Sequence, residues 1–107
     1  MELGKIIQLL IKKRNLTQVQ VANSIGKSAT ALSQIIKGSY NPNPETLDRI
    51  CKVLDVPLPV LYFLSISEKD IPKNKVEQYK MLAPSIKEFI LTIFGSENID
   101  LIKELSN

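Results

Sequence analysis

The sequence predicts an all-α protein, with a bundle of five helices followed by a C-terminal helical extension. Apolar residues recur at helical spacing in one segment after another, and no segment of the first 63 residues alternates convincingly with the period of a strand. Of the 107 residues, 44% are hydrophobic but only 6% are aromatic, so the core must be mostly aliphatic. Such a core suits packed helices, and the length allows one small domain with an appendage.

The five helices of the bundle are expected within the first 63 residues. Their predicted ranges are 2–14, 17–25, 28–37, 45–54 and 58–63. The first helix ends on Lys12, Lys13 and Arg14, whose charges complement the negative end of the helix dipole. We expect these three side chains to form a solvated cap rather than to contact a ligand.

The second and third helices, with the turn between them, have the features of a helix-turn-helix. Thr17 is a good N-cap, because its hydroxyl can accept from the unpaired N–H groups of the first turn. Ala22 is small enough for a second helix to cross closely, and Gly26 can take the left-handed conformation that ends a helix. Ser28 then caps the third helix. The apolar stripe of that helix is formed by Leu32, Ile35 and Ile36. This spacing favours DNA binding over an ordinary αα-hairpin, which uses the same turn chemistry.

A loop and two further helices complete the predicted bundle. Residues 38–44, GSYNPNP, have the composition of a loop, and Pro44 and Glu45 suit the first turn of the helix that follows. The apolar stripe of this helix is formed by Leu47, Ile50, Cys51 and Leu54. Cys51 is the only cysteine, and we expect a small buried residue there rather than a reactive thiol.

The composition argues against an enzyme and predicts neither a cofactor nor a metal ion. The chain has no histidine, which is the usual metal ligand and the usual general base near neutral pH. It also has no phosphate-cradling glycine loop. The N-terminus lacks a signal-peptide pattern, and no apolar run approaches the roughly 18 residues of a membrane span. We therefore expect a cytoplasmic, non-enzymatic protein with no membrane association.

The net charge of +3 is unevenly distributed. Residues 1–62 carry eight Lys/Arg and four Asp/Glu, whereas residues 63–107 carry six and seven. The basic excess therefore coincides with the predicted helix-turn-helix, where a surface that faces phosphates needs it. A solvated basic face would look similar.

Residues 3–62 closely resemble the Cro/C1-type (XRE) helix-turn-helix domain of phage repressors and bacterial regulators. The matching positions are Leu16-Thr17-Gln18, Ala22, Ile25-Gly26, Ser28, Ile35, Gly38, Asn41-Pro42, Glu45-Thr46-Leu47 and Leu54-Asp55-Val56. The chain departs from the family pattern at Asp55, where glycine is usual, and at Ile36, where a polar residue is common. The resemblance implies a five-helix, lambda-repressor-like DNA-binding bundle that binds double-stranded DNA.

By this resemblance, the third helix enters the major groove. The residues expected to face the bases are Ser28, Ala29, Thr30, Ser33 and Gln34. Gln34 can bond bidentately to the N6/N7 edge of adenine, and Ala29 and the Thr30 methyl can pack on thymine methyls. Because no arginine lies on this helix, we predict a site that favours A·T pairs. The alternative for Gln34 is a solvated polar residue.

A second set of residues is expected to anchor the DNA backbone. These residues are Thr17, Gln18, Lys27, Lys37, Tyr40 and Asn41. The family uses the glutamine that matches Gln18 in this way, and the dipole at the start of the second helix favours a phosphate.

The C-terminal part of the chain has its own apolar pattern. Residues 64–75 are predicted to be a polar connector, and residues 76–107 a helical tail that ends in a helix over about 97–106. The residues assigned to dimerisation are Ile86, Phe89, Ile90, Ile93, Phe94 and Ile102. We favour a homodimer over packing of the tail against its own bundle, because one small domain rarely supplies both a core and a second apolar face.

Two functions from different classes remain open on the sequence alone. The first is a sequence-specific transcriptional regulator, a repressor that binds a palindromic operator as a homodimer. The second is an antitoxin-like interaction module, whose tail neutralises a protein partner while its helix-turn-helix autoregulates.

Overall fold

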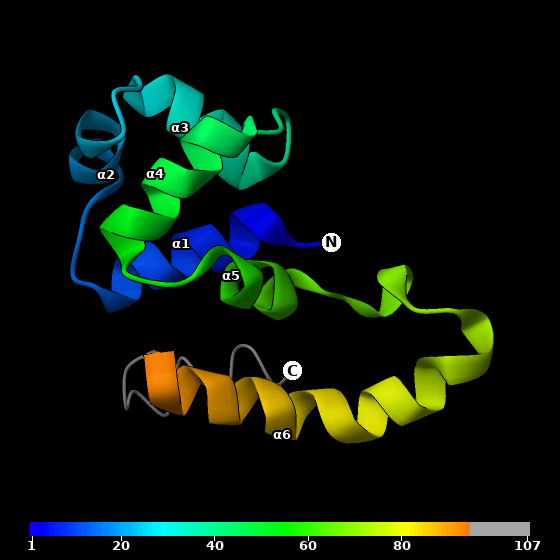
Figure 1. Ribbon diagram of the computed structural model, residues 1–107. Helices are drawn as coiled ribbons and strands as arrows, with labels where there is room; N and C mark the ends of the chain where they lie inside the picture. Colours follow the sequence, from blue (N-terminus) through cyan, green and yellow to red (C-terminus); the bar gives the residue numbers. More distant parts are fainter. Residues whose placement is uncertain (95–107) are drawn as a thin grey trace.

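The computed structural model describes residues 1–94, and every regular element within them is helical (Figure 1). The elements are α1 (Leu3–Lys13), α2 (Gln18–Ser24), α3 (Ala29–Lys37), α4 (Pro44–Leu54), α5 (Leu58–Ser65), the 3-10 turns η1 (Glu68–Asp70) and η2 (Lys73–Lys75), and α6 (Val76–Phe94). The prediction of an all-α protein is confirmed. The helix predicted over 97–106, with Ile102, lies outside the described residues.

The ends of α2 and α3 follow the predicted capping chemistry. Thr17 Oγ1 accepts from the Gln20 N–H at 3.1 Å, and Gln20 Oε1 accepts from the Thr17 N–H at 2.9 Å, which completes a capping box. Ser28 Oγ accepts from the Ala31 N–H at 3.0 Å. Gly26 takes a φ of 71°, so the left-handed turn predicted between the two helices is confirmed.

The core of the bundle is aliphatic, as its composition predicts. Its most deeply buried side chains are Ile6, Ile7, Leu10, Val21, Ile25, Leu32, Ile50, Leu54, Leu61 and Leu64. Cys51 is also buried, as expected. In Figure 1, α1 runs between α4 and α6, with α5 beside it. Six of the eleven residues of α1 are buried, so α1 is the central helix of the bundle.

Gly4 is the point of closest approach between α1 and α3. A Cβ built on Gly4 would overlap the carbonyl oxygen of Ile36 and would lie 2.7 Å from that of Ile35. Both oxygens belong to the backbone, which cannot move aside as a flexible side chain could. No pattern in the sequence predicts this contact. Only a residue without a Cβ allows α1 to lie this close to the C-terminal turns of α3.

The predicted connector over 64–75 is wrong at its start. Leu64 and Ser65 complete α5 and are buried, and Ser65 Oγ donates to the Leu61 carbonyl at 2.7 Å. Beyond α5, Asp70 pairs with the N-terminal amine of Met1 at 3.0 Å. The segment that leads to α6 therefore contacts Met1, and it then runs out past this residue before the chain turns back into α6 (Figure 1).

Helix α6 packs along the bundle on the side remote from α3 (Figure 1). Its residues that are buried or packed against the core are Ala83, Ile90, Leu91 and Phe94. From the N-terminal half and the middle of the helix, the Tyr79 hydroxyl and Lys87 Nζ both donate to the Ile66 carbonyl, at 2.8 and 2.7 Å. This helix is thus attached to the bundle by apolar packing and by polar contacts.

We predict that Gly4→Ala lowers the free energy of unfolding by about 2 kcal/mol, because the added methyl forces α1 away from two backbone carbonyls. Helix propensity alone predicts the opposite sign, with alanine better than glycine by about 1 kcal/mol. Urea denaturation followed by circular dichroism measures the change. Lys5→Ala, at an exposed neighbouring position, is the control and should be nearly neutral. A Gly4→Ala protein as stable as the wild type would contradict the close approach.

We predict that Asp55→Gly stabilises the protein by about 0.5–1 kcal/mol. Asp55 ends α4 with φ 57° and ψ 48°, a left-handed conformation that is strained for a residue with a Cβ. Asp48→Gly, inside the same helix, is the matched control and should destabilise by about 1 kcal/mol. Thermal unfolding of both variants distinguishes the two signs. A lower melting temperature for Asp55→Gly would mean that its carboxylate makes a stabilising contact that outweighs the strain.

Candidate nucleic-acid interface

Helix α3 presents most of the predicted base-reading residues to solvent. Ser28, Ala29, Thr30 and Gln34 are exposed, and Ser33 is half-buried. The Ser28 hydroxyl is occupied in part, because its oxygen caps the helix. The hydroxyl proton stays free to donate, since a serine hydroxyl is both a donor and an acceptor. The structure thus brings the five residues together at the N-terminal half and middle of one helix.

The opposite face of α3 fixes the orientation of this surface. Leu32 and Ile35 are buried among the core residues of the bundle, and Ile36 is half-buried against them. Ile36 therefore makes an apolar contact at the position where a polar residue is common in the family. From α2, Val21 and Ala22 contribute buried side chains to the same core. The exposed side of α3 cannot rotate without removing this row of side chains from the core.

The predicted backbone-anchoring residues also lie at the surface around α2 and α3. Thr17, Lys37, Tyr40 and Asn41 are exposed, whereas Gln18 and Lys27 are half-buried. Tyr40 is a large aromatic side chain with 46% of its surface exposed, next to the Gly38 turn that ends α3. Thr17 Oγ1 already accepts from Gln20, but the hydroxyl can still donate to a phosphate oxygen.

Arg49 stabilises the turn of the helix-turn-helix, a role that was not predicted from the sequence. Its Nη1 donates to the Ile25 carbonyl at 3.3 Å, at the end of α2. Its Nη2 pairs with Glu45 Oε1 at 2.7 Å, one turn earlier on α4. The spacing of four between Glu45 and Arg49 was a visible signal for the ion pair. The contact with Ile25 had no local signal.

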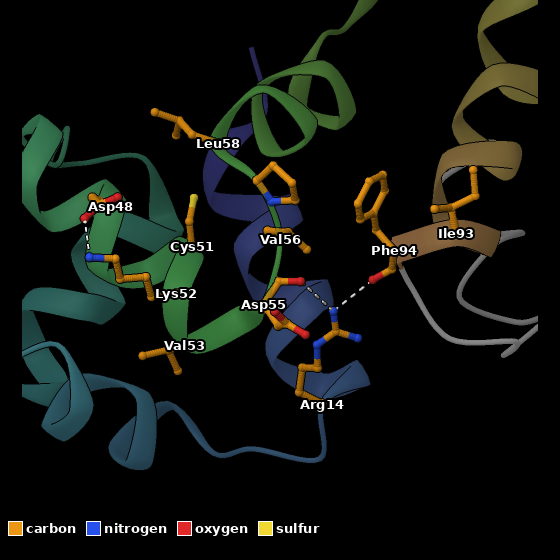
Figure 2. Close-up of a pocket in the computed structure, with 11 residues that line it drawn as sticks. Arg14, Asp48, Cys51, Lys52, Val53, Asp55, Val56, Leu58, Ile93 and Phe94 are labelled. Carbon is orange, nitrogen blue, oxygen red and sulfur yellow. Dashed lines mark hydrogen bonds and ion pairs between the residues drawn. The ribbon is translucent and has the colours of Figure 1, made fainter.

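Arg14 does not behave as the solvated cap that the sequence predicts. Its Nε donates to the Leu54 carbonyl at 2.8 Å, and its Nη2 donates to the carbonyls of Asp55 at 3.4 Å and Phe94 at 2.8 Å (Figure 2). The oxygens of Leu54 and Asp55 lie at the C-terminal end of α4, where the helix dipole favours a cation, and that of Phe94 lies in the last described turn of α6. One guanidinium therefore joins α1 and α4 to α6.

The two lysines before Arg14 differ in their surroundings. Lys12 is exposed, as predicted. Lys13 Nζ is buried and has no hydrogen-bond partner among the described residues. Burial lowers the pKa of the Lys13 ammonium, and the charge of Arg14 lowers it further. The prediction of a solvated cap therefore holds only for Lys12.

An open cleft of about 870 Å³ lies between the end of α4 and the end of α6 (Figure 2). Cys51, Leu58 and Ile93 are among its lining residues. Burial raises the pKa of the Cys51 thiol, and the nearby Asp48 carboxylate raises it further. A raised pKa disfavours the thiolate, which is the nucleophilic form of cysteine. The interpretation of Cys51 as an inert core residue is thus consistent with its surroundings.

Residues 1–94 contain no group of three or more His, Cys, Asp or Glu side chains that could hold a metal ion. Within the same residues, none of the helices combines the length and the apolar character that crossing a membrane requires.

The family follows from comparison with known proteins. A family model described as helix-turn-helix matches residues 7–61, a stretch that runs from α1 into α5 and contains α2, α3 and α4. The chain belongs to the Cro/C1-type (XRE) helix-turn-helix family. It is a DNA-binding transcriptional regulator, and α3 occupies the position of the recognition helix in this family.

Individual relatives of this regulator include two proteins of Bacillus phage phi105. The ImmF control region 10 kDa protein is 37% identical over 65 residues, which cover 61% of this chain and 72% of that protein. The immunity repressor protein is 31% identical over 97 aligned residues, which cover 79% of this chain and 67% of the repressor. Antitoxin PezA of Streptococcus pneumoniae is 32% identical over 79 residues, which cover 74% of this chain and 47% of PezA. No solved structure matches the chain at a significant level.

We predict that Arg14→Met lowers the free energy of unfolding of this regulator by about 2 kcal/mol, because it leaves partly buried carbonyls of Leu54 and Phe94 without their charged donor. It should also increase hydrogen exchange near the end of α6. Lys12→Met, at an exposed position in the same helix turn, is the matched control and should change stability by less than about 0.5 kcal/mol. Equal effects of the two variants in urea denaturation would show that the hydrogen bonds of Arg14 to α4 and α6 do not stabilise the fold.

Proposed function

We propose that this regulator is a repressor that binds a palindromic operator as a homodimer, with residues 28–37 as the recognition segment. The observation that carries the proposal is the exposed, uncharged row on α3, which is held in place by a buried opposite face. Ser28, Ala29, Thr30, Ser33 and Gln34 supply short polar and methyl groups, of the kind that read base edges in the major groove. The similarity to a phage immunity repressor supports repression rather than activation.

Contacts with phosphates are assigned to the residues that surround this row. Thr17, Gln18, Lys27, Lys37, Tyr40 and Asn41 lie at the start of α2, in the turn, and at the end of α3 with the loop that follows. Such contacts fix the register of the protein on the duplex without reading sequence. We assign no catalytic role to any residue, and we place the protein in the cytoplasm, where it meets bacterial or phage DNA.

The homodimer is assigned to α6. Among the residues predicted for dimerisation, Ile90 and Phe94 pack against the core of their own chain, whereas Ile86, Phe89 and Ile93 are exposed. The helix thus packs in cis with one face and offers another face to a partner. A symmetric dimer sets two recognition helices about 34 Å apart, which is one turn of DNA, and reads a palindrome.

A second function, the antitoxin-like module, has one observation in its favour. The match to Antitoxin PezA includes 74% of this chain, a share between the 61% and 79% that the two phage relatives cover. The aligned region is less than half of PezA, however, and the two phage relatives are covered more completely. We therefore favour the repressor.

We predict that selection of duplexes from a random DNA pool enriches a palindrome that favours A·T pairs, with half-sites about one helical turn apart. Gln34→Ala should lose discrimination at one position of each half-site by about 1–3 kcal/mol, because it removes a bidentate contact. Gln8→Ala is the matched control, since Gln8 is an exposed glutamine on α1, outside the predicted interface. It should select the same motif as the wild type.

Other results would change the assignment. Guanines opposite Thr30 and Gln34 would refute the proposed A·T preference. An unchanged motif with Gln34→Ala would show that Gln34 does not read bases. A single enriched half-site would support DNA binding and refute the homodimer. No enrichment at moderate salt would favour the protein-interaction module.

A further inference from the structure

Helix α6 carries a second apolar stripe that the described part of the chain, residues 1–94, leaves open. Leu82, Ile86, Phe89 and Ile93 are between 43% and 64% exposed. They are spaced by four, three and four residues, which is the repeat of a coiled-coil seam. Single exposed apolar residues are ordinary on a protein surface, but four large ones in one row over about 17 Å of helix mark an interaction site.

The charges of α6 lie away from this stripe. The helix has four charged side chains, Glu77, Lys80, Lys87 and Glu88. A rotation of about 100° per residue places each of them more than a third of a turn from the centre of the stripe. The positions beside the stripe are Ala83, Ser85, Ile90 and Thr92, all uncharged. An identical stripe meets no like charge here, so a second copy of this chain is the partner that the surface fits.

The position of α3 decides how two such stripes pair. The centre of the stripe lies about 110° around α6 from the mean direction of Ala83, Ile90, Leu91 and Phe94, which are buried or packed toward the bundle, so the stripe points to the side of the bundle. Figure 1 shows α3 and α6 at opposite sides of the molecule, with α1 between them. A two-fold axis parallel to α6 would carry the partner's α3 to the other side of the dimer. An axis perpendicular to α6 that points into the bundle keeps both α3 helices on one side.

We propose that two copies of the chain pair through α6 in antiparallel orientation, with Leu82 against the partner's Ile93 and Ile86 against the partner's Phe89. This inference rests on the homodimer proposed above and specifies its interface. One duplex can contact both recognition helices only if they face the same side, and antiparallel pairing about the perpendicular axis provides that arrangement. Parallel pairing of the same stripe gives a dimer that cannot place both α3 helices on one operator.

Charge insertion tests which face of α6 is used. Phe89→Glu places a charge in the stripe, and sedimentation equilibrium should show a monomer. Its affinity for a palindrome should fall by about 100-fold, while binding to a single half-site should be unchanged. Met81→Glu is the matched control, because Met81 is 76% exposed on the same helix but lies about 100° from Leu82, outside the stripe. It should remain a dimer. Dissociation by Met81→Glu but not by Phe89→Glu would overturn the assignment of the stripe.

Disulfide cross-linking tests the orientation. Leu82→Cys and Ile93→Cys proteins, mixed and oxidised, should form a cross-linked dimer, whereas neither should cross-link with itself. In the antiparallel pair, two copies of position 82 are offset by about 16 Å along the helices, beyond the reach of a disulfide. The wild type controls for Cys51, which is buried. Self-linking of each single variant would show a parallel pair and overturn the proposal.

The same samples separate this inference from the proposed function. A wild-type chain that sediments as a monomer and selects a single half-site would refute the homodimer itself. A wild-type dimer that selects a palindrome but gives no cross-link in the mixture would keep the proposed function and refute only the antiparallel stripe.

Discussion

The close crossing of α1 over the C-terminal turns of α3 is the constraint on which the rest of the structure depends. Gly4 permits two backbones to approach to a distance that no other residue type allows. Because α3 is only nine residues long, its orientation is set almost wholly by Leu32, Ile35 and the helices behind them. The direction in which the exposed row of α3 points therefore depends on the packing of α1 against the buried side of α3.

Local signals account for the parts of the fold that the sequence predicts well. Thr17, Gly26 and Ser28 act through hydrogen bonds and φ angles within four residues of themselves, and each adopts the predicted role. Gly4 and Arg14 act across the fold, on backbone atoms of residues 31 to 80 positions away. Carbonyl groups are the same in every residue, so nothing in the sequence marks which of them a glycine or an arginine will meet.

The tail shows a different limit of sequence reasoning. The apolar residues of α6 are correctly found by their spacing, but periodicity alone does not say which of two faces the bundle covers. Ile90 and Phe94 pack on the core, and Ile86, Phe89 and Ile93 are left exposed. The choice depends on the polar contacts that orient α6, above all the one that Lys87 makes with the Ile66 carbonyl. The assignment of base-reading residues has the same limit. Exposure identifies the candidate side chains but not the base that each one contacts.

In the proposed dimer, α6 is both the interface and the attachment of each bundle to that interface. Tyr79 and Lys87 bond its N-terminal half and its middle to the Ile66 carbonyl, and Arg14 bonds the Phe94 carbonyl. These contacts lie on both sides of the buried Leu91 and prevent the helix from pivoting about it. The orientation of each recognition helix relative to α6 is then set by contacts within each chain, while the pairing of the stripes sets how the two chains lie relative to each other. Half-site spacing would therefore depend both on the stripe and on residues such as Arg14, Tyr79 and Lys87, which lie outside the two proposed interfaces.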